Sequence, residues 1–381
     1  MRVCMVMSSP LPPSEGIGSY VWNLSRFLSA AGHRVQIITR SAPGKPGYEQ
    51  VGCIPIWRPR FLPLYPLHVD VHGLFVQRLV GRLGAGVDLF HLHTPLPPPL
   101  QVQAPYLLTV HSPMMAASRA IRLTGIRELL IRLQTPVSIS IEKRLLAGAA
   151  GLAVVARSVA GELGAYGIDR SQIRVMGNGV DIDLFRPLDE RPAPGSSKPT
   201  ILAAGRLDVK KGLEDLIESM RFVVQRCPDA RLWLAGDGPL QNRLRRKTAQ
   251  LGLGQAVCFL GHVAQAQMVG LYQATTVFVH ASHYEGLPTV LLEAMACGKG
   301  VVSTAVSGAL DVVEDGVNGL LVAASAPGAL AEAISRLLAD VELRARLGAA
   351  GRHTVEEAFS WPVVSRKYVS YYQDLLAQGA R

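Results

Sequence analysis

Short apolar runs alternate with longer amphipathic stretches along most of this chain of 381 residues. In the first half, residues 15–32 carry apolar side chains at helical spacing, and strand-like runs lie at 1–8, 33–40, 87–93, 104–111, 151–156 and 173–179. In the second half, runs at 199–206, 230–238, 256–263, 275–282 and 298–304 predict further strands. Helices are predicted from about Leu213, over 241–250 and at the C-terminal end. Because the strand runs are apolar and β-branched, they predict parallel sheets covered by helices on both faces.

One stretch interrupts this alternation. Residues 186–199, RPLDERPAPGSSKP, are rich in Pro, Gly and Ser and are typical of a linker. The chain is also long for a single core. The sequence therefore predicts the α/β class, with two doubly wound, Rossmann-like domains at 1–190 and 198–361 that face each other across a cleft. In such sheets, ligands bind at the carboxyl ends of the strands.

The composition narrows the class of protein. Apolar residues make up 49% of the chain and charged residues 18%, which indicates a folded protein. The five cysteines are far apart and odd in number, so they favour a reducing compartment over a disulfide framework or a zinc site. The start, MRVCMVM, predicts a first buried strand rather than a signal peptide. We therefore expect a cytoplasmic protein.

The net charge of +10 is unevenly distributed. Residues 1–190 hold 19 Lys and Arg against 12 Asp and Glu, and the remainder holds 20 against 17. The segment 118–146 is basic along one side and apolar along the other, which predicts peripheral contact with an anionic membrane at the inner face of the plasma membrane. Core packing with a solvated basic face is the alternative. No nucleic-acid partner is expected, because the basic residues are not interleaved with aromatics.

Two glutamates stand out in the apolar block at 277–304. Glu285 precedes the turn formed by residues 286–288, in which Pro288 suits the first position of a helix. Glu293 lies inside that apolar helix, where a carboxylate is costly unless it is hydrogen-bonded. Glu285 lies beside the free N–H groups of the helix start, which attract anions. A ligand with both hydroxyls and phosphates fits this arrangement, and a nucleotide sugar is the obvious candidate.

Two alternatives apply to the same glutamates. Both could be ordinary surface residues of a helix, although the surroundings of Glu293 are unusually apolar for that. They could also form a glycosidase pair. A fully helical span would separate Glu285 from Glu293 by roughly 12 Å. That is too far for such a pair, which needs at most about 9.5 Å.

Basic residues follow the strand predicted at 199–206. Arg206 comes directly after it, and Lys211 lies five residues on, ahead of a helix. A guanidinium and an ammonium in one place would neutralise a diphosphate leaving group, and a solvated basic turn is the alternative. His262 and Val263 end another strand of the same sheet and would form a wall for the nucleotide.

Three features of the first half are candidates for ligand contact. Gly16 and Gly18 lie just before a predicted helix, where backbone can approach a ligand closely. His111 ends a strand and could hydrogen-bond a sugar hydroxyl or assist an acceptor, or simply cap the strand. His91 and His93 share one face of a strand, which suits packing at the strand end better than metal binding.

Together these segments resemble the family-4 glycosyltransferases, retaining enzymes of the GT-B architecture. The resemblance covers nearly the whole chain. It rests on the blocks EGIGSYVWNLSRFLSAAGHRVQIIT, NGVDIDLF, AAGRLDVKKG, LAGDGP, EGLPTVLLEAMACG and DGVNGLLV in this order. The resemblance implies that Arg206 and Lys211 hold the donor diphosphate, that Glu293 bonds the ribose hydroxyls and that Glu285 bonds the donor sugar. It also implies that the backbone of Gly286, Leu287 and Pro288 meets the sugar and phosphate.

The same resemblance assigns roles in the first domain. Gly16 and Gly18 would approach the diphosphate, and His111 would touch the donor sugar or its acceptor. The C-terminal helix, at 362–381, would cross back to the first domain. The family needs no divalent metal, and no other cofactor is expected. The catalytic group then comprises Arg206, Lys211, Glu285 and His111.

These observations predict an enzyme: a hexosyltransferase-type, retaining, metal-independent glycosyltransferase. It would move a sugar from a UDP-, GDP- or ADP-sugar to a hydroxyl of a glycan or lipid-linked acceptor, as in the synthesis of cell-envelope glycans. A sugar-nucleotide epimerase or a phosphorylase on the same architecture is an alternative. A sugar-nucleotide-binding subunit without catalytic turnover is another.

Overall fold

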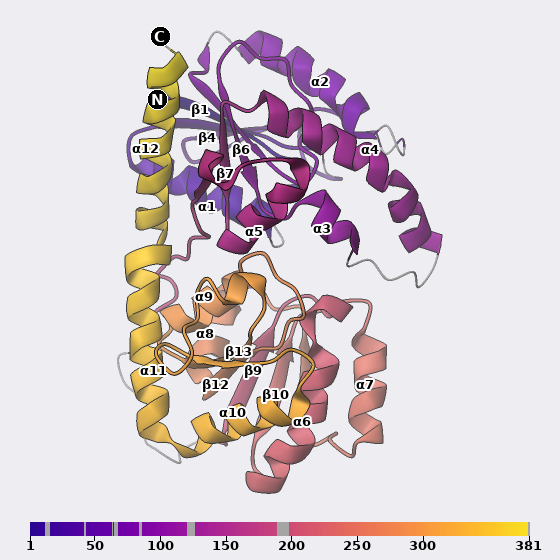
Figure 1. Cartoon of the computed structure of the whole chain (residues 1–381), viewed down its shortest axis with the longest axis vertical. Coiled ribbons are helices and arrows are strands. Elements are labelled where there is room, and N and C mark those ends of the chain that lie inside the picture. The colour runs from indigo at the N-terminus through magenta and orange to yellow at the C-terminus, as the bar shows by residue number, and fades with distance from the viewer. Residues whose placement is uncertain are drawn as a thin grey trace. The chain divides into compact units, whose positions relative to one another are not determined.

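The computed structural model describes residues 1–11, 16–41, 43–62, 64, 68–83, 86–119, 126–188 and 198–379 (Figure 1), and the side chains of 117, 119 and 126–134 lie outside this description. Contacts divide the chain into two compact units. Unit 1 comprises residues 1–178 and 364–381, and unit 2 comprises residues 179–363. Of the segment predicted as a linker, 186–199, the residues 189–197 lie outside the described part.

The described residues of unit 1 form an eight-stranded sheet in the order β3-β4-β2-β1-β5-β6-β7-β8. Its strands are β1 (Arg2–Val6), β2 (Arg34–Ile38), β3 (Tyr48–Val51), β4 (Ile54–Trp57), β5 (Leu89–His93), β6 (Tyr106–Val110), β7 (Gly151–Val154) and β8 (Ile173–Val175). The helices that precede unit 2 in the chain are α1 (Ile17–Ala30), α2 (His68–Leu83), α3 (Met114–Arg119), α4 (Ile126–Gly148) and α5 (Arg157–Glu162). Every residue of β5 and β7 is buried, which requires cover on both faces of the sheet.

One edge of this sheet differs from the prediction. β3 pairs antiparallel with β4, whereas the alternation of strands and helices predicts parallel strands. The hairpin turns at Gly52, whose φ of 59° suits a glycine. Because β3 is largely exposed, it carries no apolar run, and the four residues of β4 also lie outside the predicted runs. All other pairings in the described sheet are parallel.

The described residues of unit 2 form a six-stranded parallel sheet in the order β11-β10-β9-β12-β13-β14. Its strands are β9 (Thr200–Ala204), β10 (Arg231–Ala235), β11 (Val257–Gly261), β12 (Val277–His280), β13 (Gly300–Thr304) and β14 (Leu320–Val322). Its helices are α6 (Leu213–Arg226), α7 (Gln241–Gln250), α8 (Gln265–Ala274), α9 (Thr289–Ala296), α10 (Pro327–Ala339) and α11 (Val341–Thr354). The predicted fold class, with two doubly wound parallel sheets, is confirmed.

The last helix, α12 (Trp361–Gly379), begins in unit 2 and continues into unit 1. In unit 2, the N–H of Trp361 donates to the carbonyl of Val180 at 3.1 Å. In unit 1, Tyr368 and Tyr372 of α12 are fully buried. Their hydroxyl groups enter a polar network under the carboxyl ends of the strands.

Candidate active site

Two loops meet at the point where the strand order of unit 2 reverses. β9 and β12 are neighbours in the sheet, and the chain continues from β9 to β10 on one side and from β12 to β13 on the other. The loop after β9 carries Arg206 and Lys211, and the loop after β12 carries Glu285. Such switch points are the usual ligand sites of open parallel sheets.

Lys211 and Glu285 form an ion pair across this switch point. Nζ of Lys211 lies 2.5 Å from Oε2 of Glu285. Ser282 Oγ donates to the same oxygen at 3.4 Å, and Nε2 of His280 lies 3.8 Å away. The two charged side chains are 20% and 24% exposed, so a ligand can still reach them.

The environment of Glu285 keeps its carboxylate ionised. Burial favours the neutral acid, but His280 and Lys211 together outweigh it and lower the pKa of Glu285 to about 2. His280 is itself buried, with Nδ1 2.9 Å from Ser303 Oγ, and burial lowers its pKa. Glu285 is therefore a hydrogen-bond acceptor at physiological pH and not a proton donor.

Close backbone packing holds the two loops together. Gly212 has a φ of 58°, and a Cβ there would lie 2.0 Å from the carbonyl oxygen of Ala281. The N–H of His283 donates to the carbonyl of Lys210 at 2.7 Å. The ion pair is therefore supported by backbone on either side of it.

The turn after Glu285 is fixed by the loop that follows β13. Ser307 Oγ and the N–H of Gly308 donate to the carbonyl of Glu285 at 2.6 and 3.2 Å. A Cβ at Gly308 would lie 1.6 Å from the carbonyl oxygen of Gly286. Only glycine fits this approach.

The start of α9 corrects one detail of the prediction. Pro288 is the residue before the first helical turn rather than its first member, because its ψ of 108° is extended. Leu287 and Pro288 are both buried. The N-cap residue of α9, Pro288, makes no side-chain cap hydrogen bond, so the first N–H groups of the helix are available to an anion.

Arg206 lies exposed on the β9 loop. Within the described part of the chain, its side chain has no hydrogen bond or ion pair. The loop itself is anchored, because the N–H of Leu207 donates to the carbonyl of Asp237 at 2.9 Å. An exposed cation on an anchored loop suits capture of an anionic ligand.

Glu293 lies on α9 and is bonded from within the protein. The hydroxyl of Tyr272, on α8, donates to Oε2 of Glu293 at 2.7 Å. Burial raises the pKa of Glu293 to about 7, although the hydrogen bond from Tyr272 works in the opposite direction. The predicted cost of a carboxylate in this helix is therefore visible as a perturbed pKa. Lys211 and Glu285 meet directly, but no contact among the described residues joins Glu293 or Arg206 to that pair.

The other predicted residue pair in unit 2 lies two strands away. His262 is exposed and Val263 partly buried, directly after β11. A Cβ at Gly236 would lie 1.9 Å from the carbonyl oxygen of Gly205, and the N–H of Gly236 donates to Gly261 at 2.7 Å. The ends of β9, β10 and β11 are therefore packed side by side, which leaves His262 and Val263 at the same sheet edge as Arg206.

In unit 1, the predicted glycines lie at the start of α1. Gly16 is exposed and has a φ of 67°, which glycine adopts readily, and Gly18 is buried in the first turn. His111 follows β6 and is partly buried. Its Nε2 lies 3.2 Å from Nδ1 of His93, and burial lowers its pKa to about 3, so its imidazole is neutral.

The ring nitrogens of His91 are both engaged within the protein. Nδ1 of His91 lies 2.7 Å from the hydroxyl of Tyr372, and Nε2 lies 2.6 Å from Oγ1 of Thr109, so both nitrogens are occupied. Among the described residues, no group of three or more His, Cys, Asp or Glu side chains could hold a metal ion.

Most of the basic segment predicted to touch a membrane, 118–146, lies outside the described side chains. In its described end, Lys143 and Arg144 are exposed, whereas Glu142 is buried and accepts from the hydroxyl of Tyr166 and the N–H of Met114. No helix in the described ranges is both long and apolar enough to cross a bilayer.

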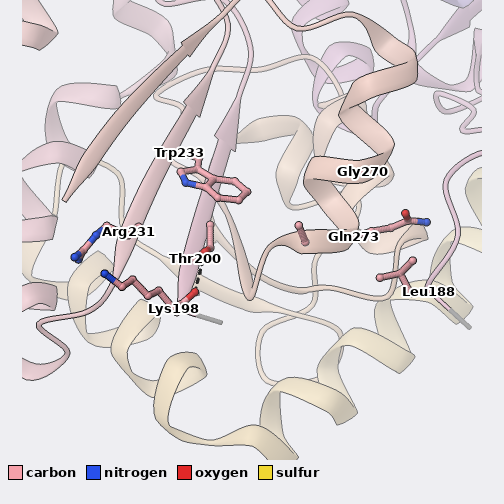
Figure 2. Close-up of a pocket in the computed structure, with 8 residues that line it drawn as sticks. Leu188, Lys198, Thr200, Arg231, Trp233, Gly270 and Gln273 are labelled. Carbon is pink, nitrogen blue, oxygen red and sulfur yellow. Dashed lines mark hydrogen bonds between the residues drawn. The ribbon is translucent and has the colours of Figure 1, made fainter. Parts of the chain in front are cut away.

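Figure 2 shows a pocket in unit 2 at the amino ends of the strands, opposite the candidate site. Thr200 and Arg231, the first residues of β9 and β10, line it together with Trp233 and Gln273. It lies at the amino ends of the strands, whereas Arg206 and Glu285 lie at the carboxyl ends. This pocket is therefore separate from the candidate site.

Two members of the site, Tyr272 and His280, were not predicted from the sequence. His280 is the polar end of the buried strand VFVH, a signal that could have marked it. Nothing near Tyr272 in sequence indicates its bond to Glu293, because 21 residues separate the two.

Two family models match this chain. "Glycosyltransferase Family 4" matches residues 14–184, and "Glycosyl transferases group 1" matches residues 187–354. The D-inositol 3-phosphate glycosyltransferase of Xylanimonas cellulosilytica is 30% identical over 412 residues, which cover 97% of this chain and 96% of that protein. The phosphatidyl-myo-inositol mannosyltransferase of Mycobacterium tuberculosis is 28% identical over 409 residues, covering 100% and 99%. The structure of sucrose-phosphate synthase from Thermosynechococcus elongatus matches with a TM-score of 0.84 at 25% identity, over 99% of each chain.

Proposed function

Since this chain belongs to the family-4, group 1 glycosyltransferases, we propose that it is a retaining enzyme that transfers a sugar from a nucleotide diphosphate to a hydroxyl group. The resemblance stated from the sequence is thereby confirmed at the level of the family. The observation that carries the proposal is the Lys211–Glu285 pair at the switch point of unit 2, with Arg206 on the same loop. A cation and an ionised carboxylate side by side suit a ligand that has a phosphate next to a sugar.

The donor diphosphate would be held by cations. Lys211 would exchange part of its contact with Glu285 for a phosphate oxygen, and the exposed Arg206 would bind a second one. The free N–H groups at the start of α9 and the backbone of 286–288 would add further donors. As the bond from C1 of the sugar to the β-phosphate oxygen breaks, these groups stabilise the charge on the leaving diphosphate. No metal ion or other cofactor is needed for this neutralisation.

The carboxylates would hold the hydroxyl groups. Glu285, ionised at physiological pH, would accept hydrogen bonds from the donor sugar. Glu293 would accept from the ribose through the oxygen that Tyr272 does not use. His262 and Val263 would border the base, for which UDP, GDP and ADP are all candidates.

The acceptor would be a glycan or a lipid-linked molecule. C1 bonds to an acceptor oxygen, and the proton of that hydroxyl passes to the leaving diphosphate, with retention of the anomeric configuration. Unit 1 would supply Gly16, Gly18 and His111 to the donor or acceptor. Two of the relatives are named for inositol-containing compounds, which supports testing inositol, its phosphate and phosphatidylinositol first.

The basic excess of residues 1–190 supports a cytoplasmic enzyme on an anionic membrane surface, which flotation with anionic and neutral liposomes would test.

Donor screening tests the proposal directly. We expect one class among UDP-, GDP- and ADP-sugars to raise the melting temperature, because ligand binding stabilises the folded state. With that donor and the acceptors above, we expect a product with a retained anomeric centre by NMR and unchanged turnover in EDTA. If no donor produced a thermal shift and no donor supported transfer, the proposal would be contradicted. An epimerised sugar nucleotide or a sugar phosphate as product would favour the epimerase or the phosphorylase.

A further inference from the structure

A buried polar network runs through unit 1 beneath His111. It connects α12 to the end of β8 through five side chains: Tyr372, His91, Thr109, Tyr368 and Tyr20. All five are buried. Such a network is stable only if each donor finds an acceptor.

The directions of its hydrogen bonds follow from counting protons. The hydroxyl of Tyr20 donates to the carbonyl of Gly177 at 3.2 Å, so Tyr368 must donate to Tyr20, at 2.8 Å. Thr109 then donates to Tyr368 at 3.1 Å, and Nε2–H of His91 donates to Thr109 at 2.6 Å. The hydroxyl of Tyr372 donates to the bare Nδ1 of His91 at 2.7 Å. Each hydroxyl uses its single proton once.

Beside this network, one hydrogen bond joins the rings of His93 and His111. His93 is packed against His91, with ring centroids 4.0 Å apart, and its Nδ1 lies 3.2 Å from Nε2 of His111. Nε2 of His93 is buried and has no hydrogen-bond partner among the residues that the structure describes. The ring of Tyr20 packs edge-on against His111, with centroids 4.7 Å apart. The network therefore fixes the rings on either side of His111.

Only one of two proton arrangements avoids a buried, unpaired N–H group. If His111 donated to His93, the proton of His93 would lie on its unpartnered Nε2. If Nδ1–H of His93 donates to His111 instead, Nε2 of His93 carries no proton and is an unpaired acceptor. Orphaned donors are the rarer of the two in protein interiors. The second arrangement leaves His111 with its own proton on Nδ1, for which no partner exists among the described residues.

We propose that His93 is a positioning residue that fixes His111 as the Nδ1-protonated tautomer, so that His111 meets its ligand as a hydrogen-bond donor and not as a base. The part that concerns the ligand rests on the proposed function, in which His111 touches the donor sugar or the acceptor. A donor at this position would bind a sugar oxygen. The burial that keeps both rings neutral prevents His111 from carrying away the proton of the acceptor.

The tautomer can be read directly by NMR. In protein labelled with ¹⁵N-histidine, long-range ¹H–¹⁵N correlations distinguish protonated from bare ring nitrogens, and a His111→Asn variant identifies the signals of His111. We expect Nδ1 of His111 to be protonated and Nε2 bare. A wild-type His111 that is protonated at Nε2 would overturn the proposal, whatever the activity of the enzyme.

Two substitutions at His93 separate positioning from packing. Asn places an amide N–H near the position of imidazole Nδ1, so His93→Asn should keep the tautomer of His111 and transfer rates within about threefold. His93→Leu should shift His111 towards the Nε2-protonated form and lower kcat by about 10- to 100-fold, as loss of such supporting partners does elsewhere. A Leu variant that retains the wild-type tautomer would refute the role of His93. An Nδ1-protonated His111 in a protein without any transferase activity would remove the proposed function and leave the tautomer assignment in place.

Discussion

We expect the pKa of Glu293 to make binding of the proposed donor sensitive to pH. With a pKa of about 7, the carboxyl is about one-tenth ionised at pH 6 and about nine-tenths ionised at pH 8. In the proposed complex, ribose hydroxyls would donate to the ionised form, so the affinity for the donor should rise about tenfold between these pH values, or about 1.4 kcal/mol. At pH 7, binding should release about half a proton per donor molecule. The diphosphate of a nucleotide sugar does not titrate in this range.

Calorimetric titration at pH 6, 7 and 8, in two buffers of different ionisation enthalpy, measures both the affinity and the released protons. Two variants isolate the responsible group. Glu293→Gln should remove the pH dependence. Tyr272→Phe deletes the hydrogen bond that lowers the pKa of Glu293, so the midpoint should move above 7 while the size of the effect remains. Equal wild-type affinity at pH 6 and pH 8, or an unchanged slope in Glu293→Gln, would refute this reasoning.

Three further perturbations test the site. Arg206→Ala should lower the transfer rate by about 10²–10³ without loss of stability, since the side chain is exposed, whereas Arg221→Ala, at an exposed arginine on α6, should leave steady-state kinetics unchanged. The folded-state pKa of Glu285 lies below its ordinary value of 4.5, so its contribution to the free energy of unfolding is complete above pH 4.5 and is lost as the pH falls towards 2. In urea denaturation, the free energy of unfolding of wild type should exceed that of Glu285→Gln by at most about 3 kcal/mol above pH 4.5, and this difference should disappear towards pH 2. A difference that stays constant across that range would count against the ion pair. Gly308→Ala places Cβ against the carbonyl of Gly286 and should cost about 1–3 kcal/mol in a melting experiment, whereas Gly328→Ala, in open space on α10, should be neutral or stabilising by up to about 1 kcal/mol; equal effects would contradict the packing argument.

The positions of the sheets and of most loops could be predicted from local pattern. The run at 277–280 is apolar because β12 is buried on both faces, and residues 241–250 form α7 as predicted. Three strands were not predicted. β3 is largely exposed and so carries no apolar run, and β4 and β14 have only four and three residues. Glu285, Arg206 and Lys211 could be named as candidates because charges directly after buried strands must lie at the carboxyl edge of a sheet.

The order of the strands in the sheet determines which of these side chains are in contact. Lys211 and Glu285 are 74 residues apart in the chain and touch because β9 and β12 are neighbours. His91 and Tyr372 are 281 residues apart and bond because α12 packs into unit 1. Local periodicity records how deeply a residue is buried, since burial acts on each side chain separately. Hydrogen-bond partners, tautomers and pKa values depend on groups brought together by the tertiary fold, and one segment of sequence does not contain them.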